Sequence, residues 1–187
     1  MALATDDRAG LKSPQSKKTQ LLLKAAIVRH KKLEFEAAKL IYEEVQKSDP
    51  CNVMSWQLSG LLCCQMEDYE KSIELLSRAV ALAPFHEDSY YHRAISYQEL
   101  GYLEQSFDDY SSVLSINQEN FHALNNRGNV LKELGRLDEA LSDLDLALVV
   151  KPNYACAFNN RGIVLKELGH IDKALMDYSR ALSLEPH

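Results

Sequence analysis

Residues 125–135 read Asn-Asn-Arg-Gly-Asn-Val-Leu-Lys-Glu-Leu-Gly, and residues 159–169 repeat this string with Ile163 in place of Asn129. Aligning 121–152 with 155–186, without a gap, gives 18 identities in 32 positions. A fixed period of this size is typical of proteins built from stacked structural repeats. Such arrays present an extended curved surface, so the period favours a binding function over a catalytic one.

The same spacing extends back through the chain without an insertion or a deletion. One position holds only small residues, namely Gly162, Gly128, Ala94, Gly60 and Ala26. Another holds proline in four of five cases, at Pro186, Pro152, Pro84 and Pro50, with Gln118 as the exception. We therefore divide the chain into a polar tail, 1–18, which we expect to be disordered, and five units. These units are 19–52, 53–86, 87–120, 121–154 and 155–187.

Each unit has the pattern of two helices joined by a short turn. In the fourth unit, Leu124, Gly128 and Leu131 recur at helical spacing, and a second helical pattern follows from residue 140. Gly135 lies between the two patterns, where the end of a helix often needs a left-handed residue. We expect the small-residue position to mark a close approach of the two helices.

The pattern resembles the tetratricopeptide repeat, which has the signature Trp-x2-Leu-Gly-x2-Tyr, then Ala-x3-Phe, then Pro, over about 34 residues. The best matches are Trp56, Gly60, Ala79 and Pro84 in the second unit, and Gly128, Ala140 and Pro152 in the fourth. The resemblance covers about nine tenths of the chain and implies an all-α, right-handed α-solenoid of five helix-turn-helix repeats. The first unit departs from it at Leu33, in place of the turn glycine, and at Lys39, in an apolar position.

Composition and charge limit the classes of protein to which this chain can belong. The chain is 46% apolar, with one Trp and seven Gly, and it has no apolar run long enough to cross a membrane. Its four cysteines do not recur with the period, so a reducing compartment is favoured and we expect a cytoplasmic protein. The net charge of −6 is concentrated in the third unit and disfavours nucleic acid as a partner.

No arrangement of residues predicts catalysis. The six histidines form no His-x-x-x-His pair, and there is no glycine-rich phosphate loop. Asp143 and Asp145, like Asp108 and Asp109, are expected to face solvent, where they lack the enclosed setting that acid–base chemistry needs. We therefore expect neither an enzyme nor a cofactor or metal site.

The candidate binding surface is found by subtracting the residues that packing uses. The first helix of each unit leaves one face free, and in tetratricopeptide arrays this face lines a concave groove. Its N-terminal half is apolar, whereas its C-terminal half carries paired asparagines, whose amides can hydrogen-bond any peptide backbone. We expect the exposed asparagines to serve binding and to contribute little to stability. The candidate partner-binding residues are Leu58, Leu61, Tyr91, His92, Asn125, Asn126, Asn129, Lys132, Asn159, Asn160 and Lys166.

Two known modes of peptide binding in this family can be compared with the groove. Asn126 and Asn160 resemble the asparagine ladder in the repeat domain of protein O-linked N-acetylglucosamine transferases, although His92, Leu58 and Lys24 depart from it. The two-carboxylate clamp of chaperone adaptors does not fit, since Asp88 would repel a carboxylate. The favoured function is a scaffold or adaptor that binds a peptide or helix. The alternative is a targeting domain or subunit of a larger enzyme, such as a glycosyltransferase, with catalysis elsewhere.

The last helix keeps the apolar pattern of an internal unit. Leu175, Tyr178 and Leu182 occupy positions that a following unit would cover. An uncovered apolar patch usually marks an interface. We therefore predict a second candidate surface at these residues, with self-association as one outcome.

Overall fold

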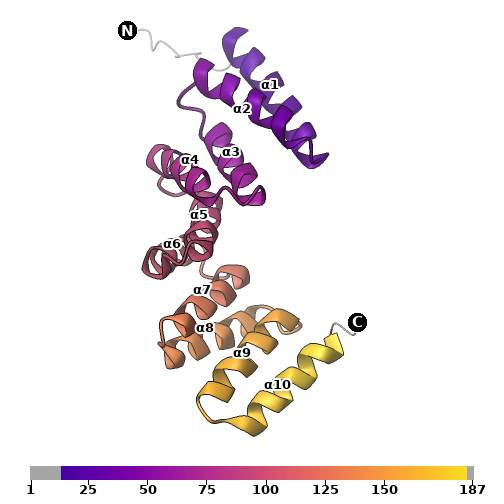
Figure 1. The fold of residues 1–187 in the computed structure, drawn as a ribbon, viewed down its shortest axis with the longest axis vertical. Coiled ribbons are helices and arrows are strands. Elements are labelled where there is room, and N and C mark those ends of the chain that lie inside the picture. Colours follow the sequence, from indigo (N-terminus) through magenta and orange to yellow (C-terminus); the bar gives the residue numbers. More distant parts are fainter. Residues whose placement is uncertain (1–13, 185–187) are drawn as a thin grey trace, which may run out of the picture.

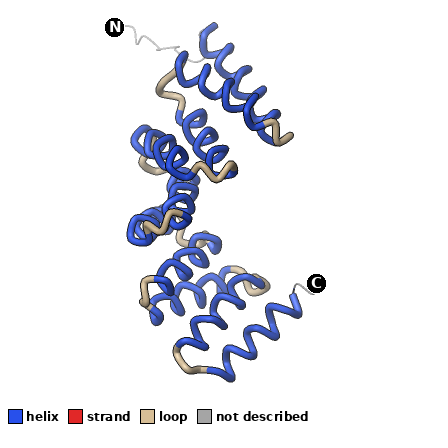
Figure 2. Tube along the Cα trace, viewed as in Figure 1, coloured by secondary structure: helices blue, strands red, loops and turns tan. Residues whose placement is uncertain are grey.

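The computed structural model describes residues 14–184, and within this range the chain forms ten α-helices (Figure 1). Figure 2 shows that the described part is helical throughout, with short loops between the helices. The helices are α1 (Pro14–Lys31), α2 (Phe35–Ser48), α3 (Val53–Gln65), α4 (Tyr69–Leu82), α5 (Glu87–Glu99), α6 (Leu103–Ile116), α7 (Phe121–Glu133), α8 (Leu137–Val150), α9 (Ala155–Glu167) and α10 (Ile171–Leu184). The prediction of an all-α solenoid is confirmed.

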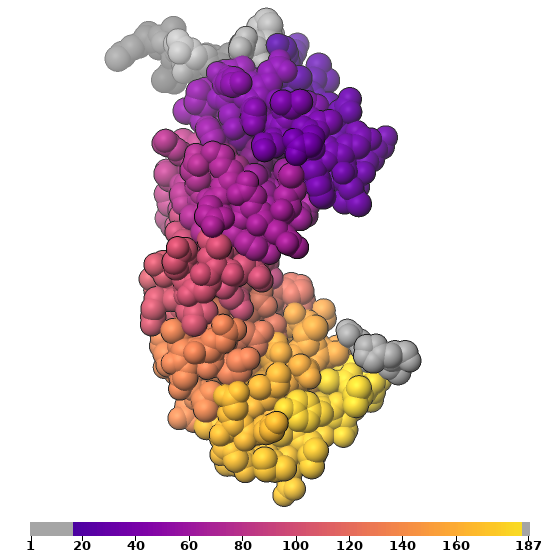
Figure 3. Space-filling model, viewed as in Figure 1, coloured from indigo at the N-terminus to yellow at the C-terminus, as the bar shows by residue number. Residues whose placement is uncertain are grey.

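The helices pair within units and stack between units. Each odd-numbered helix packs on the even-numbered helix that follows it, and neighbouring units contact one another in chain order. The odd-numbered helices also touch directly, most closely between α3 and α5 and between α7 and α9. The result is a bent column, whose first and last units project to the same side in the space-filling view (Figure 3).

The five turns within the units share one backbone conformation. Gly101, Gly135 and Gly169 have positive φ angles of 76°, 75° and 81°, as the turn pattern predicts. The first two units place Leu33 and Glu67 at the same position, and each has a φ of 62°. A side chain in this left-handed region is strained, so the first two turns are less favourable than the other three.

The close approach of the two helices in a unit is confirmed. A Cβ atom on Gly128 would lie 2.9 Å from Leu144 Cγ, and one on Gly162 would lie 2.6 Å from Tyr178 Cε1. Buried apolar residues form two clusters, one on each side of the boundary between the second and third units. One cluster joins α5 to α9 and the other joins α1 to α3.

The start of the first helix differs from the expectation. Helix α1 begins at Pro14, so residues 14–18, which we expected in a disordered tail, are helical instead. The extension is held against α2, since Lys18 Nζ lies 3.1 Å from Glu44 Oε1 and Thr19 is buried. The remainder of the expected tail, 1–13, lies outside the described residues, as does the end of the fifth unit after Leu184. None of the described helices is long and apolar enough to cross a bilayer.

Candidate functional site

A hollow of about 710 Å³ lies in the C-terminal half, between α7, α9 and α10. It brings together four of the predicted groove asparagines with Tyr178 and Leu182, which we had assigned to a separate interface. The two predicted surfaces therefore meet in one site. Its lining consists of Asn125, Asn126, Tyr154, Ala155, Cys156, Asn159, Asn160, Tyr178, Ala181 and Leu182.

Three of the asparagine amides form a continuous hydrogen-bonded chain across the last three units. Asn160 Nδ2 donates to Asn125 Oδ1 at 2.9 Å. Asn125 Nδ2 donates to Asn126 Oδ1 at 3.1 Å. Asn126 Nδ2 in turn donates to the hydroxyl oxygens of Tyr91 and Tyr110, at 3.1 and 3.3 Å. The chain orients each amide and connects α9 to α7 and α7 to the third unit.

This network corrects the expectation that the groove asparagines are free. Asn125 is only 4% exposed, and Asn126 and Asn160 are both committed to neighbouring units. The physical reason is that the first helices of adjacent units lie close enough for their side chains to meet, which spacing along one helix does not reveal. Asn159 differs, because it is exposed and makes no side-chain hydrogen bond within residues 14–184.

The predicted residues of the middle of the groove form an aromatic contact. The Tyr91 ring lies edge-on to His92, with 5.4 Å between centroids, and edge-on to the buried Tyr110 at 5.8 Å. Burial lowers the pKa of His92, although Asp88 opposes the shift. Burial also raises the pKa of the Tyr91 hydroxyl, so this group stays protonated and can donate a hydrogen bond.

The remaining predicted groove residues do not line the hollow. Leu58 packs against the N-terminal apolar cluster, and Leu61 is half-buried nearby in α3. Asn129 and Lys132 are half-buried in α7, whereas Lys166 is exposed at the end of α9. These residues follow the course of the first helices, away from the C-terminal hollow.

The predicted C-terminal interface is divided between two faces. Tyr178 and Leu182 face the hollow, but Leu175 lies on another surface depression, beside Phe158 and Met176. Leu182 is 61% exposed, while Leu114 and Leu148, at the same position of the two preceding units, are each 8% exposed. The difference arises because a following unit covers the internal leucines.

A repeated ion pair was missed by the sequence analysis. Arg93 donates two hydrogen bonds to Asp109, at 2.7 and 2.8 Å. The same bidentate geometry joins Arg127 to Asp143, and Arg161 to Asp177. The three carboxylates are 5–6% exposed, so the expectation that Asp109 and Asp143 face solvent is wrong, whereas Asp108 and Asp145 are exposed.

Each of these arginines also reaches the preceding unit. The Nη1 atoms of Arg93 and Arg127 donate to Ser77 Oγ and Ser111 Oγ, at 3.0 and 3.1 Å. Arg161 Nη1 donates instead to Asp145, at 2.6 Å. The hydrogen bond to Asp177 raises the pKa of Arg161, which keeps the guanidinium charged. The signal in the sequence is an aspartate that follows each of the three arginines at the same separation.

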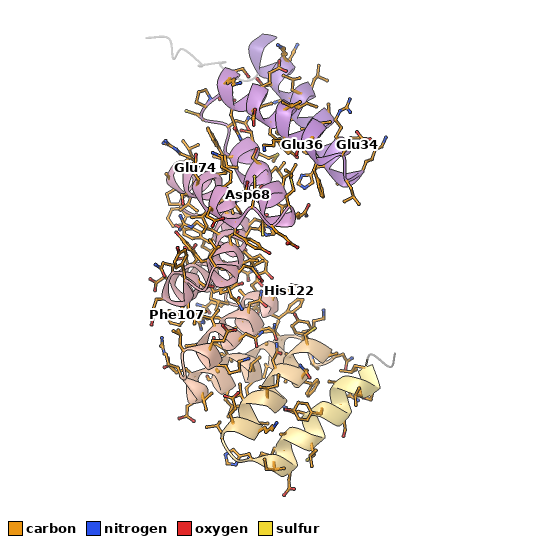
Figure 4. The ribbon with its side chains drawn as sticks, viewed as in Figure 1. Glu34, Glu36, Asp68, Glu74, Phe107 and His122 are labelled. Atoms are coloured by element: carbon orange, nitrogen blue, oxygen red, sulfur yellow. The ribbon has the colours of Figure 1, made fainter. Side chains whose placement is uncertain are left out.

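The described residues hold no group of three or more His, Cys, Asp or Glu side chains that could bind a metal ion. The hollow instead offers amides, an aromatic ring and an apolar wall. Figure 4 shows His122, from α7, on the open side of the bent column, whereas Phe107 and Glu74 lie on its opposite side. Surfaces on these two sides are therefore separate.

Family models of the tetratricopeptide repeat match residues 55–86, 87–120, 128–169 and 155–187. The chain belongs to the tetratricopeptide repeat family, a class whose members generally bind protein or peptide partners. A search of curated proteins finds no match.

Solved structures with the same fold extend over nearly the whole chain. A MamA protein is 22% identical, covers 90% of this chain and 92% of its own, and superposes with a TM-score of 0.83. MamA from Desulfovibrio magneticus RS-1 is 13% identical, with coverage of 90% and 95% and a TM-score of 0.84. YrrB, described as a TPR protein with an unusual peptide-binding site, is 20% identical, with coverage of 93% for both chains and a TM-score of 0.78. These likenesses show the fold, and the resemblance to O-linked N-acetylglucosamine transferase arrays stays a prediction.

Proposed function

We propose that this chain is a non-catalytic scaffold or adaptor that binds an extended peptide in the hollow between α7, α9 and α10. The observation that carries the proposal is the lining of the hollow, where asparagine amides stand opposite an apolar wall that includes Ala181 and Leu182. An amide offers both a donor and an acceptor, so it can bind the main chain of a peptide of any sequence. The apolar wall would then select among the side chains.

The amides of the hollow divide into fixed and free groups. The hydrogen bond to Asn125 orients Asn160, while Asn159 next to it has its whole amide available. We therefore expect Asn159 to contact the peptide directly. The hydrogen-bonded chain of the other amides holds the helices that form the hollow in place.

A library of random peptides displayed on phage provides a test without a known partner. We expect selection on the full chain to yield peptides whose affinity falls about tenfold in Asn159→Ala and in Leu182→Asp, since each removes a direct contact. Glu167→Gln, an exposed change near the end of α9 and outside the hollow, is the matched control. Failure to select any peptide, or selected peptides that bind all three variants equally, would overturn the proposal.

The alternative function is a targeting domain or subunit of a larger enzyme such as a glycosyltransferase. The positions of Asn126 and Asn160 favour it, because they match the asparagine ladder of such arrays. The hydrogen bonds of Asn126 to Tyr91 and Tyr110 weigh against it, because they occupy the amide nitrogen that a ladder would offer to a peptide. The adaptor is therefore preferred, with a cytoplasmic location and with neither nucleic acid nor membrane as a partner.

Self-association is a second proposed activity and rests on the two ends of the array. Leu21 and Val28 on α1 are 68% and 52% exposed, yet Ala157 and Val164, at the same positions in α9, are fully buried against the preceding unit. Helix α1 of one copy thus presents the face that would cover Leu182 of another. Sedimentation velocity should show association that rises with concentration and that Leu182→Glu weakens, whereas Leu146→Glu, an exposed change in α8, should not. A monomer at all concentrations would contradict this activity.

A further inference from the structure

Two small hollows lie at equivalent junctions near opposite ends of the array. One, of about 310 Å³, lies between the fourth and fifth units. The other, of about 260 Å³, lies between the first and second. Seven residues line the hollow between the fourth and fifth units. Three repeat periods earlier in the sequence, each of them has a counterpart that lines the hollow between the first and second units. The two hollows are thus the same site of the repeat with different side chains.

At the junction of the fourth and fifth units, the site is built around a guanidinium. Arg161 donates to both carboxylate oxygens of Asp177, and its third nitrogen donates to Asp145 of the preceding unit. Its guanidinium also lies over the Phe158 ring, 5.5 Å from the centroid. Arg93 stacks in the same way over Tyr90, at 5.6 Å, whereas Arg127, which has Leu124 at that position, lies over Phe107.

At the junction of the first and second units, the guanidinium is absent but much of its surroundings remains. Ser59 stands at the position of Arg161, and Leu75 stands at that of Asp177. Glu43 stands at the position of Asp145 and also carries a carboxylate. Trp56 stands at the position of Phe158 and also carries an aromatic ring. With serine in place of arginine, no guanidinium lines this hollow, whose volume of about 260 Å³ compares with about 310 Å³ beside Arg161.

The polar groups that line this hollow can accept further hydrogen bonds. Glu43 forms no ion pair within residues 14–184, although it is half-buried. Gln46 donates its Nε2 to Ser59 Oγ at 2.9 Å and to Ser55 O at 3.2 Å, and its Oε1 receives no hydrogen bond from the described residues. Trp56 Nε1 donates to Pro50 O at 2.8 Å, which fixes the ring. The site thus offers a carboxylate, an amide oxygen and an indole face.

We propose that the junction of the first and second units binds an arginine side chain of a partner protein. A guanidinium is planar, carries five donors and stacks on aromatic rings, so it uses all three groups at once, whereas an ammonium does not. Two lysines also line the site. Lys71 is neutralised by Glu74, whose Oε2 lies 2.7 Å from its Nζ, and Lys39 remains as an opposing charge that limits the affinity.

This site is separate from the hollow of the proposed peptide groove. Glu74, which lines it, lies on the side of the column away from His122 in Figure 4. The two sites are formed by different units, since α2, α3 and α4 form this one and α7, α9 and α10 form the hollow. Binding at one can therefore be tested without the other.

Trp56 is the only tryptophan in the chain, so its indole N–H signal in an NMR spectrum reports on this site alone. We expect N-acetyl-arginine amide to shift that signal saturably and N-acetyl-lysine amide to bind at least about threefold more weakly. Glu43→Gln should weaken the binding of the arginine probe, whereas Glu44→Gln, an exposed change beside it, should not. Lys39→Leu, which copies Leu141 of the other junction, should strengthen it.

Ser59→Arg provides an internal occupant for the same space. Its guanidinium should lie beside Trp56 and Glu43, as that of Arg161 lies beside Phe158 and Asp145, and the arginine probe should then no longer shift the Trp56 signal. The proposal is overturned if the wild-type chain shows no saturable shift, if the two probes bind equally, or if Glu43→Gln binds the arginine probe as well as the wild type does.

Discussion

Units one and two share their helix pattern with units three to five, but the two regions are joined by different chemistry. In the last three units, an arginine on the first helix pairs with an aspartate on the second and reaches back to the unit before. In the second unit these two positions hold Ser59 and Leu75, and in the first they hold Ala25 and Ile41. The apolar clusters follow the same division, one joining α5 to α9 and the other α1 to α3.

The difference shows that one backbone spacing accepts either a charged or a neutral junction. Replacing a buried ion pair by apolar residues is often neutral for stability, while removing one partner alone is costly. We therefore expect the complete ion pair to contribute little to stability, although the loss of one partner should be costly. At the junction of the first and second units, where the pair is missing, Glu43, Gln46 and Trp56 line the hollow without a guanidinium.

The largest expected effect comes from breaking an ion pair in the charged region. Asp143→Ala leaves the guanidinium of Arg127, whose side chain is 21% exposed, without its bidentate partner and should cost about 3 kcal/mol of unfolding free energy. The double variant Arg127→Leu with Asp143→Leu copies a neutral junction and should lie within about 1 kcal/mol of wild type. Urea denaturation followed by circular dichroism measures both, and equal losses in the two variants would show that the charge pair is not responsible.

The second effect concerns the small-residue position in each region. Gly162→Leu forces a side chain against the Tyr178 ring, from which even a Cβ would be 2.6 Å, and should cost about 1–3 kcal/mol. Because each unit contacts only its neighbours, hydrogen exchange should increase in α9 and α10 and not in α1 and α2. Gly60→Leu, which would meet Leu76, should instead increase exchange in α3 and α4 and not in α9 and α10. A uniform increase in exchange over all units would contradict this independence.

The third effect separates structural asparagines from free ones. Asn126→Ala removes three hydrogen bonds, one of them to the buried Tyr110, and should cost about 1–2 kcal/mol. Asn159→Ala should change stability by less than about 0.5 kcal/mol, since Asn159 is exposed. Thermal unfolding compares the two, and similar losses for both would mean that the hydrogen-bonded chain has no structural role.

A smaller effect is expected at the turns, where the two regions also differ. Glu67→Gly and Leu33→Gly place glycine at a φ of 62° and should stabilise the first two units by about 0.5–1 kcal/mol each. Gly101→Ala, at a φ of 76° in the third unit, should lower stability by a similar amount. If all three substitutions shift the melting temperature in the same direction, backbone strain at the turns does not explain the changes in stability.

The smallest effect is a pH dependence from His92. Burial lowers its pKa below the ordinary 6.5, so the unfolded chain binds this proton more readily than the folded one. The contribution of His92 to stability is complete above about pH 6.5 and is lost as the pH falls through the folded pKa. Melting temperatures at pH 7.5 and 5.5 should therefore differ less in His92→Gln than in the wild type. Identical differences would exclude His92 as the source.

The local features of the fold could be predicted from the sequence. The repeat period located five units, helical spacing located their helices, and the Gly or Ala position marked the close contacts that Gly128 and Gly162 make. These features depend on residues within one unit, where spacing along the chain fixes spacing in space. The candidate site was predicted in part, because the asparagines, Tyr178 and Leu182 were identified but assigned to separate surfaces.

What the sequence by itself determined is the repeat, its helices and the class of binding protein to which it belongs. Only the tertiary structure decided that Asn125 is buried, that Asp143 faces Arg127, and that Ser59 lines a hollow together with Glu43 and Trp56. The physical reason is that each of these outcomes depends on the distance and angle between two helices. A helical pattern in the sequence indicates the face of the helix on which a residue lies. Which side chain of the neighbouring helix it contacts depends on how the helices and units pack together.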